Sequence, residues 1–232
     1  MELQSRQTSR SCANKFRTWN SMPQKGSLII VSGPSGAGKS ALASAVLAIL
    51  PGLNFSVSYT TRAPRGNERD GTEYHFVNKA QFEALIRGGD LLEWAEVYGH
   101  YYGTAREFID QKLQRGDDVL LDIDVQGALT MRRKRPEAIT IFIMPPSYQD
   151  LRLRLENRKL DKEYVIEQRL RIARREIAHY RDYDYLIIND DFDDSVEELK
   201  AIILGARCRM TSRAESAKSV VATFGGSDAE NT

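Results

Sequence analysis

The strongest chemical signal in the chain is a glycine-rich octapeptide. The pattern G-x-x-x-x-G-K-S/T is matched by Gly33, Pro34, Ser35, Gly36, Ala37, Gly38, Lys39 and Ser40. Glycines let backbone N–H groups turn toward phosphate oxygens, Lys39 adds a positive charge beside the β/γ-phosphates, and the Ser40 hydroxyl can ligate Mg²⁺. An apolar, β-branched run over 27–32 predicts a buried strand before the octapeptide, and 40–50 has the pattern of a helix after it. Strand, loop and helix in this order predict a nucleoside triphosphate site.

Two aspartates are candidates for completing a metal site beside this loop. Asp122 and Asp124 follow the apolar run 119–121. In phosphoryl-transfer enzymes a carboxylate at the end of a neighbouring strand helps to hold Mg²⁺. Residues two apart on a regular strand point to the same face. We therefore predict Ser40 and Asp122 as Mg²⁺ ligands, although two aspartates at a strand end also fit a plain surface position.

A polar segment between the loop and Asp122 carries anion-binding side chains. Two arginines stand close to hydroxyl groups, and phenols follow: the set is Ser58, Arg62, Arg65, Tyr74 and Tyr102. Guanidinium forks match phosphate oxygens bidentately, and phenols donate without adding charge. The set therefore fits a second phosphate-binding cage, although two arginines in a loop also fit a solvated surface.

The elements that must position these residues alternate along the chain. Strands are predicted at 27–32, 55–60, 118–124, 140–144 and 185–189. Helices are predicted at 40–50, 79–87, 104–115, 148–180 and 196–210, with a loop over 62–72. This order predicts an α/β fold with a mostly parallel sheet flanked by helices on both faces.

The composition of the 232-residue chain excludes several function classes. The 33 Lys and Arg residues nearly cancel the 32 Asp and Glu residues, so no overall field favours binding to nucleic acid or to an anionic membrane. The basic run Arg132–Arg135 is expected to be a solvated helix end. Two cysteines without metal-ligand spacing and the lack of a ~20-residue apolar run favour a cytoplasmic protein.

The two ends differ in composition from the rest. Residues 1–25 are rich in Ser and Arg and are expected to be a disordered basic extension, with a transit peptide or a misplaced start as alternatives, since Met22 precedes the first strand. Residues 211–232 are rich in Ser, Ala and Gly and are expected to be a mostly disordered tail.

Six further strings occur in order beside the glycine loop. They are Ser58-x-Thr-Thr-Arg-x-Pro-Arg65, Gly71-x-x-Tyr74-x-Phe76, Glu93-Trp-Ala-Glu-Val, Tyr101-Tyr-Gly-Thr104, Leu121-Asp-Ile-Asp-Val-Gln-Gly127 and Ile188-Asn-Asp-Asp191. Together they resemble the guanylate kinase family over about 26–210. The resemblance implies a P-loop core, a GMP-binding region near 55–103 and a helical lid near 148–175.

The resemblance also implies roles for individual residues. It implies that the GMP phosphate is contacted by Ser58, Arg62, Arg65, Tyr74 and Tyr102, and that guanine is contacted by Glu93, Thr104 and Asp124. The lid arginines would be Arg154, Arg158 and Arg169, and the loop near adenine would contain Asn189 and Asp190. A carboxylate such as Glu93 can accept both N1–H and the 2-amino group of guanine, and Thr104 can donate to O6. After the lid arginine the family usually has Gly and then a small polar run, whereas here Arg158 is followed by Lys159-Leu160-Asp161, which implies a stiffer lid turn in this chain.

The implied activity is transfer of the γ-phosphoryl group of ATP to GMP, and to dGMP, with Mg²⁺ as cofactor. Lys39, Arg62 and the lid arginines would be the catalytic groups. Two alternatives remain: a catalytically inactive module that binds phosphorylated proteins, and a kinase for another nucleoside monophosphate. The assembly is expected to be a monomer or a homodimer.

Overall fold

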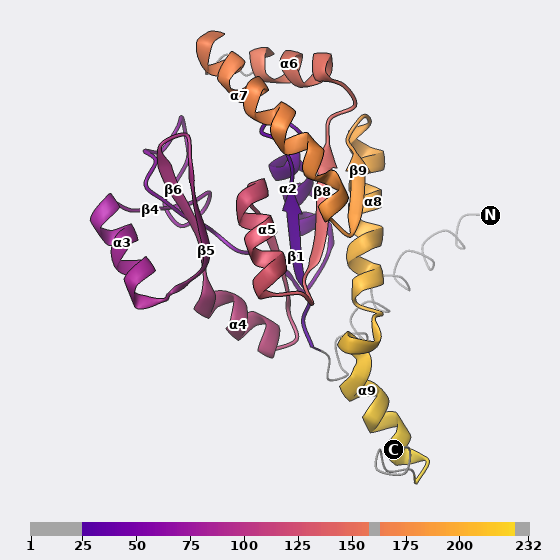
Figure 1. The fold of residues 1–232 in the computed structure, drawn as a ribbon. Helices are drawn as coiled ribbons and strands as arrows, with labels where there is room; N and C mark the ends of the chain where they lie inside the picture. The colour runs from indigo at the N-terminus through magenta and orange to yellow at the C-terminus, as the bar shows by residue number, and fades with distance from the viewer. Residues whose placement is uncertain (1–24, 158–162, 226–232) are drawn as a thin grey trace, which may run out of the picture.

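The computed structural model describes residues 25–157 and 163–225, and its centre is a five-stranded parallel sheet (Figure 1). The strand order is β2-β7-β1-β8-β9, with β1 at Leu28–Ser32, β2 at Leu53–Phe55, β7 at Asp118–Asp122, β8 at Ile139–Met144 and β9 at Tyr185–Ile188. The predicted mostly parallel sheet is confirmed.

Helices cover both faces of this sheet, as expected for buried parallel strands. Ile29 and Val31 of β1 pack with α2 (Lys39–Ile49) and α8 (Phe192–Ala206), while Leu28 and Ile30 pack with α4 (Arg106–Gln114) and α5 (Val125–Lys134). Alternate residues of one strand thus enter two different cores. The sheet is held from both sides, so the loops at its carboxyl edge have a rigid base.

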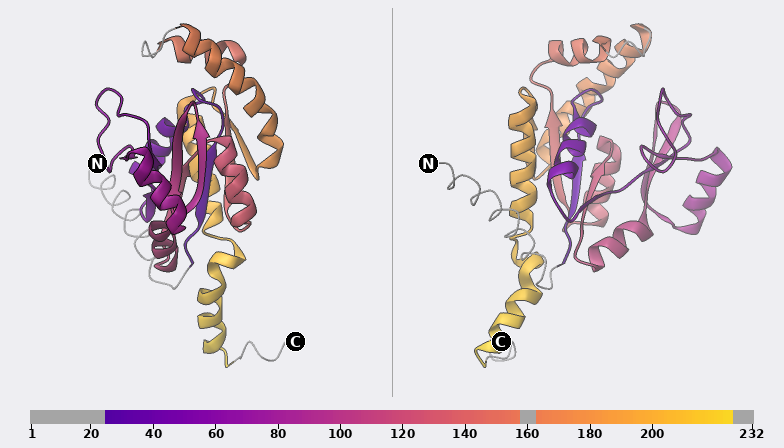
Figure 2. Two further views of the ribbon diagram at one scale, coloured as in Figure 1. Left: turned by 60° about the vertical axis from the view of Figure 1, so that its left-hand side comes forward. Right: turned by 180° about the vertical axis from the view of Figure 1, so that it is seen from behind.

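A second, four-stranded sheet stands apart from the first. Its order is β4-β3-β6-β5, with β3 at Tyr59–Thr60, β4 at His75–Phe76, β5 at Leu91–Val97 and β6 at His100–Ala105, and α3 (Lys79–Gly88) packs beside it. Figures 1 and 2 show this sheet and α8 on opposite sides of the central sheet. The sequence pattern did not predict this sheet: β3 and β4 have only two residues each, and the end of β6 was assigned to a helix.

Two helices form a small body at one end of the molecule (Figure 1). They are α6 (Tyr148–Asn157) and α7 (Glu163–Glu176), and a 3₁₀ helix, η2 (Ile177–Asp182), follows them. Their contact is a separate apolar cluster made of Leu151, Leu155, Ile166, Leu170 and Ala173. The predicted helical stretch over 148–180 is therefore divided into two α-helices and a 3₁₀ helix. Residues 158–162, between α6 and α7, lie outside the described part of the chain.

Several predicted boundaries were wrong. The helix predicted from Thr104 begins at Arg106, because His100–Ala105 pairs with β5 as an antiparallel strand. The strand predicted through Asp124 ends at Asp122, and Asp124 instead caps the N-terminus of α5, so the two aspartates do not share a regular strand. The single strand predicted over 55–60 is divided between β2 and β3, which belong to different sheets.

The expectation of a disordered tail is also corrected for the part that the structure describes. Residues Met210–Thr223 form a helix, α9, which extends from the body at the end opposite α6 and α7 (Figures 1 and 2). No Gly or Pro interrupts this stretch, and its first turns are fixed to the start of β1: Ser212 is buried, and its carbonyl accepts from Lys25 N at 3.3 Å. No helix among the described residues has the length and apolar character needed to cross a bilayer.

Candidate active site

A cavity of about 580 Å³ lies between the glycine loop, the second sheet and α7. It brings together most of the side chains that the sequence singled out, although they come from separate elements. Its lining includes Gly33, Ser35, Gly36, Gly38, Lys39, Ser40, Ser58, Arg62, Arg65, Tyr74, Glu93, Tyr102, Asp122, Asp124 and Arg169. One cavity therefore joins a triphosphate loop to a cluster of arginines and buried carboxylates.

The glycine loop has the conformation that its sequence predicts. Gly33, Gly36 and Gly38 have φ values of 138°, 94° and 98°, a backbone region that side chains with a Cβ avoid. The Lys39 ammonium donates across the loop to the carbonyls of Gly33 and Pro34, at 2.8 and 3.2 Å. Its charge is thus already held over the loop where phosphate oxygens would lie.

Asn189, one of the residues predicted near adenine, contacts the glycine loop. The Asn189 amide is buried and donates to the Ala37 carbonyl at 2.7 Å, and the Asn189 carbonyl accepts from Arg154 at 2.8 Å. Asp190, which follows Asn189, is exposed. These contacts tie α6 to the glycine loop through the end of β9, and the predicted contact of Asn189 and Asp190 with adenine stays a prediction.

The two predicted metal ligands lie in contact. Ser40 Oγ donates to Asp122 Oδ2 at 2.6 Å, beside the phosphate loop. Among the described residues no group of three or more His, Cys, Asp and Glu side chains is arranged to hold a metal ion by itself. A hydroxyl and one carboxylate fit Mg²⁺, which binds hard oxygens, keeps several waters and relies on substrate phosphates for further ligands.

The predicted phosphate cage surrounds one buried guanidinium. Arg62 is only 7% exposed, and its guanidinium lies 5.3 Å from the centre of the Tyr74 ring. Tyr74 meets Tyr102 edge to face at 5.8 Å, and Ser58 and Arg65 line the same cavity. Burial raises the pKa of Tyr74 to about 12, so its phenol remains a hydrogen-bond donor at neutral pH. Cations and neutral donors in this arrangement suit a phosphate dianion.

The other end of the cavity is acidic and buried. Glu93 on β5 is 3% exposed and accepts from the Thr104 hydroxyl at 2.5 Å. Asp124 Oδ1 accepts from Gly127 N at 2.6 Å, whereas Asp124 Oδ2 is buried and has no hydrogen-bond partner among the described residues. A Cβ on Gly127 would lie 2.8 Å from Glu93 Oε2 and 3.1 Å from Asp124 Oδ1, so both carboxyl groups converge there.

This convergence leaves acceptor oxygens without matching donors. Burial raises the pKa of Glu93 to about 7, the Thr104 hydrogen bond and Lys134 oppose the rise, and the neighbouring Asp124 adds to it. Burial likewise raises the pKa of Asp124, against the Gly127 hydrogen bond. Two buried acceptors side by side suit a ligand with adjacent N–H donors.

The predicted donation from Thr104 to guanine O6 stays a prediction. Its side chain is fully buried, and its hydroxyl hydrogen is directed to Glu93. Donation to a guanine O6 would require that hydroxyl to turn away from Glu93. In this structure Thr104 orients the Glu93 carboxylate.

The three arginines predicted for a lid differ in what the structure shows of them. Arg169 is buried on α7 and lines the cavity. Arg154 contacts the carbonyl of Asn189, so it reaches the edge of the loop. The prediction for Arg158, and for the turn Lys159-Leu160-Asp161 after it, lies outside the described residues.

Glu68 and Glu176 are among the carboxylates of this cavity that sequence reasoning missed. Glu68 pairs with Arg62, and its signal was its spacing of three residues from Arg65 in the loop over 62–72. Glu176 is the last residue of α7, and like Arg169 it lines the cavity. The two residues are seven apart, a spacing that places both on one side of the helix. Burial raises the pKa of Glu176, and the charge of Lys39 opposes this rise.

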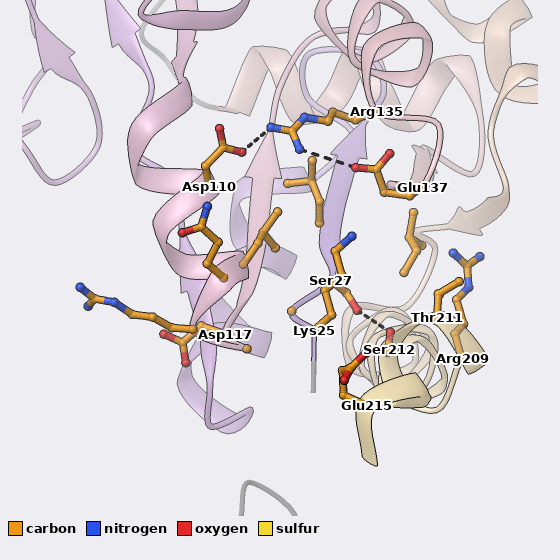
Figure 3. Close-up of a pocket in the computed structure, with 17 residues that line it drawn as sticks. Lys25, Ser27, Asp110, Asp117, Arg135, Glu137, Arg209, Thr211, Ser212 and Glu215 are labelled. Atoms are coloured by element: carbon orange, nitrogen blue, oxygen red, sulfur yellow. Dashed lines mark hydrogen bonds and ion pairs between the residues drawn. The ribbon is translucent and has the colours of Figure 1, made fainter. Parts of the chain in front are cut away.

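A larger cavity, of about 890 Å³, lies at the other end of the central sheet and contains none of these residues (Figure 3). Three of its charged groups pair with one another: Arg135 contacts Asp110 and Glu137, as Figure 3 shows. The basic run that contains Arg135 is likewise engaged within the chain, since Arg132 pairs with Asp184 and Lys134 donates to the Leu92 carbonyl. Size alone therefore does not mark the chemical site.

Comparisons with known proteins agree with this geometry. A family profile described as Guanylate kinase matches residues 25–206. The chain is 52% identical over 192 residues to the guanylate kinase of Vibrio vulnificus (strain YJ016), with 82% of this chain and 93% of that protein covered. It is 48% identical over 190 residues to the guanylate kinase of Koribacter versatilis (strain Ellin345), covering 81% and 82%. The crystal structure of guanylate kinase from Anaplasma phagocytophilum matches with a TM-score of 0.74 at 30% identity, over 89% of this chain and 99% of that one.

Proposed function

This chain belongs to the guanylate kinase family, and we infer that it is a phosphotransferase that moves the γ-phosphoryl group of ATP to GMP, giving ADP and GDP. One observation carries the inference: a single cavity is lined by Lys39 and Ser40 of the phosphate loop, by Arg62, and by the buried carboxyl groups of Glu93 and Asp124. A donor phosphate and an acceptor nucleotide would meet there.

The donor side supplies charge and position. Phosphoryl transfer needs in-line positioning and neutralisation of charge more than covalent help from the protein. The octapeptide from Gly33 to Ser40 would cradle the ATP phosphates, and Lys39 would stabilise the charge that develops between the β- and γ-phosphates. Ser40 and Asp122 would hold Mg²⁺, which neutralises phosphate charge when bound.

The acceptor side would fix the GMP phosphate by guanidinium forks and phenols. Arg62 and Arg65 would bind its oxygens, with Ser58, Tyr74 and Tyr102 as neutral donors. Arg62 would also be catalytic. This acceptor region corresponds to about 55–103, and its arrangement around one buried guanidinium supports the proposal.

Guanine would be selected by acceptors that adenine cannot satisfy. Glu93 and the unpartnered Asp124 Oδ2 present oxygens to N1–H and the 2-amino group. Adenine lacks both donors and would leave these buried oxygens unpaired, a mismatch that can cost about 10⁴-fold in specificity. None of these contacts involves the ribose 2′-hydroxyl, so we propose dGMP as a second acceptor.

The region 148–175 would act as a lid that excludes water during transfer. Arg169 lines the cavity from α7, and Arg154 already reaches the end of β9. Together with Arg158 they would cover the migrating phosphoryl group. Exclusion of water would suppress hydrolysis of ATP.

The proposal is tested by a comparison of acceptors. Purified protein with ATP and Mg²⁺ is offered GMP, AMP, CMP and UMP in turn, and ADP formation is followed. We expect turnover with GMP and none with AMP, loss of turnover in Lys39→Ala, and a sharp rise of the GMP KM in Glu93→Ala. Turnover with AMP would contradict the assignment of the guanine contacts. GMP binding without turnover would instead favour the inactive phosphoprotein-binding module.

A further inference from the structure

We propose that Glu68 is a positioning residue for the acceptor phosphate, because its carboxylate holds the Arg62 guanidinium and the Arg65 backbone in one arrangement. The inference rests on the proposed binding of GMP in this cavity. Glu68 would not touch the phosphate in this scheme, and its effect would pass through the two arginines.

The first contact fixes the Arg62 guanidinium. Its Nη2 atom lies 3.0 Å from Glu68 Oε1 and 2.9 Å from Glu68 Oε2, while its Nη1 atom donates to the Ala63 carbonyl at 2.7 Å. The central carbon of the guanidinium lies over the Tyr74 ring, 5.3 Å from its centre. A planar group held at both ends and on one face has little rotational freedom, so its remaining N–H groups keep one direction.

The second contact fixes the loop that carries the other arginine. Glu68 Oε2 accepts from Arg65 N at 2.8 Å, and Glu68 N donates to the Arg65 carbonyl at 3.0 Å. The Arg65 side chain is exposed and lines the same cavity. One carboxylate therefore links the guanidinium of Arg62 to the backbone position from which Arg65 reaches into the cavity.

The charge of Glu68 has two opposite effects on phosphate binding. It offsets part of the positive field of Arg62, which weakens attraction for an anion. It also keeps the fork in one orientation, and bidentate capture of phosphate depends on that orientation. Without the Glu68 charge the buried guanidinium of Arg62 would lose its ion-pair partner and one of the two contacts that orient it. We therefore expect the loss of orientation to outweigh the gain in positive field.

The matched variants are Glu68→Gln and Glu73→Gln. Glu73 lies in the same loop and accepts from Arg69 N at 2.7 Å, much as Glu68 accepts from Arg65 N. Glutamine keeps an oxygen for the backbone N–H in both variants. Only the first variant removes the charge that faces a guanidinium, so the pair separates loop capping from arginine positioning.

The readout is the affinity of the full chain for GMP and for guanosine, which lacks the phosphate, measured by calorimetry without ATP. We expect Glu68→Gln to weaken GMP binding about tenfold or more and to change guanosine binding less than about twofold. The KM for GMP should rise, the KM for ATP should not, and Glu68→Asp should recover part of the loss. Glu73→Gln should bind both ligands like the wild type.

Three results would overturn the inference. Equal weakening for GMP and guanosine would mean that Glu68 only keeps the region folded. Unchanged or tighter GMP binding would mean that the offsetting charge matters more than the orientation. If the wild-type protein bound GMP no more tightly than guanosine, the assignment of the phosphate cage itself would fall, a failure that is recognised before any variant is made.

Discussion

At the scale of single residues, Glu93 is the group with the clearest pH dependence. Its carboxyl is buried, and its pKa is raised to about 7 by that burial. Only the ionised form can accept both N–H groups of guanine. The protein without ligand therefore holds a partly protonated carboxyl near neutral pH, and binding of the base should release a proton.

We expect the affinity for GMP to fall as pH decreases below about 7, by up to about tenfold per pH unit. Calorimetric titrations in two buffers of different ionisation enthalpy should report proton release near pH 7 and little release near pH 9. Because Glu93→Gln cannot titrate, its weaker GMP binding should lose this acid dependence. A wild-type affinity that stays constant between pH 5.5 and 8 would contradict the role of Glu93.

The pH dependence that Glu93 gives to folding stability is opposite to the one that it gives to GMP affinity. Its folded pKa lies above the usual value of 4.5, so the folded state binds the proton more tightly than the unfolded chain does. The stabilising contribution is therefore present below about pH 4.5 and is lost as pH rises through about 7. In unfolding experiments without ligand, the wild type should lose stability relative to Glu93→Gln over this range.

At the scale of elements, Asn189 connects three parts of the fold. Its side chain holds the glycine loop at Ala37, and its carbonyl receives Arg154 from α6. The cap that begins α8, Asp191, follows two residues later. A change at Asn189 should therefore act on the loop that binds ATP and leave the second sheet unaffected.

Asn189→Ala should raise the KM for ATP several-fold with little change in the KM for GMP. It should also cost about 1–3 kcal/mol of stability, because the buried Ala37 carbonyl loses its donor. Steady-state kinetics with each substrate varied, together with urea unfolding, would measure both effects. Glu197→Gln, an exposed change on α8, serves as the control. Equal changes in both KM values would argue against a local effect on the loop.

At the scale of the whole molecule, the residues that line the candidate cavity lie between Gly33 and Glu176 in the sequence. Helix α9 projects from the opposite end, and its recorded buried side chains are Ser212 and Ser216. Removal of residues 210–232 should therefore leave kcat and both KM values within about twofold of the full chain, with a small loss of thermal stability. Acceptor assays and thermal unfolding of the truncated chain would test this. A large loss of activity would show that α9 has a role beyond packing.

How far the sequence could predict the molecule depended on the type of signal. The glycine loop and the central strands have strong local patterns, and the structure confirms the loop conformation and the parallel sheet. In the second sheet the two-residue strand β3 pairs with β6, which is distant in sequence, and no local pattern specifies this pairing. The hairpin of β5 and β6 is local but was missed, since Thr104 was assigned to a helix. The unsatisfied oxygen of Asp124 and the contacts of Glu68 depend on side-chain packing, so they could be recognised only in three dimensions.

The tripeptide Asp122-Ile123-Asp124 connects the proposed metal site to the proposed base site. Asp122 meets Ser40, and Asp124 caps α5 beside Glu93. Two residues of extended chain span about 7 Å. The distance between Asp122 and Asp124 cannot change much, because Asp122 ends a buried strand and Asp124 begins a helix. The spacing between the two substrates is thus built into the central sheet. In evolution or in engineering, a new acceptor base would be accommodated more readily by changes on β5 than by any change in this link.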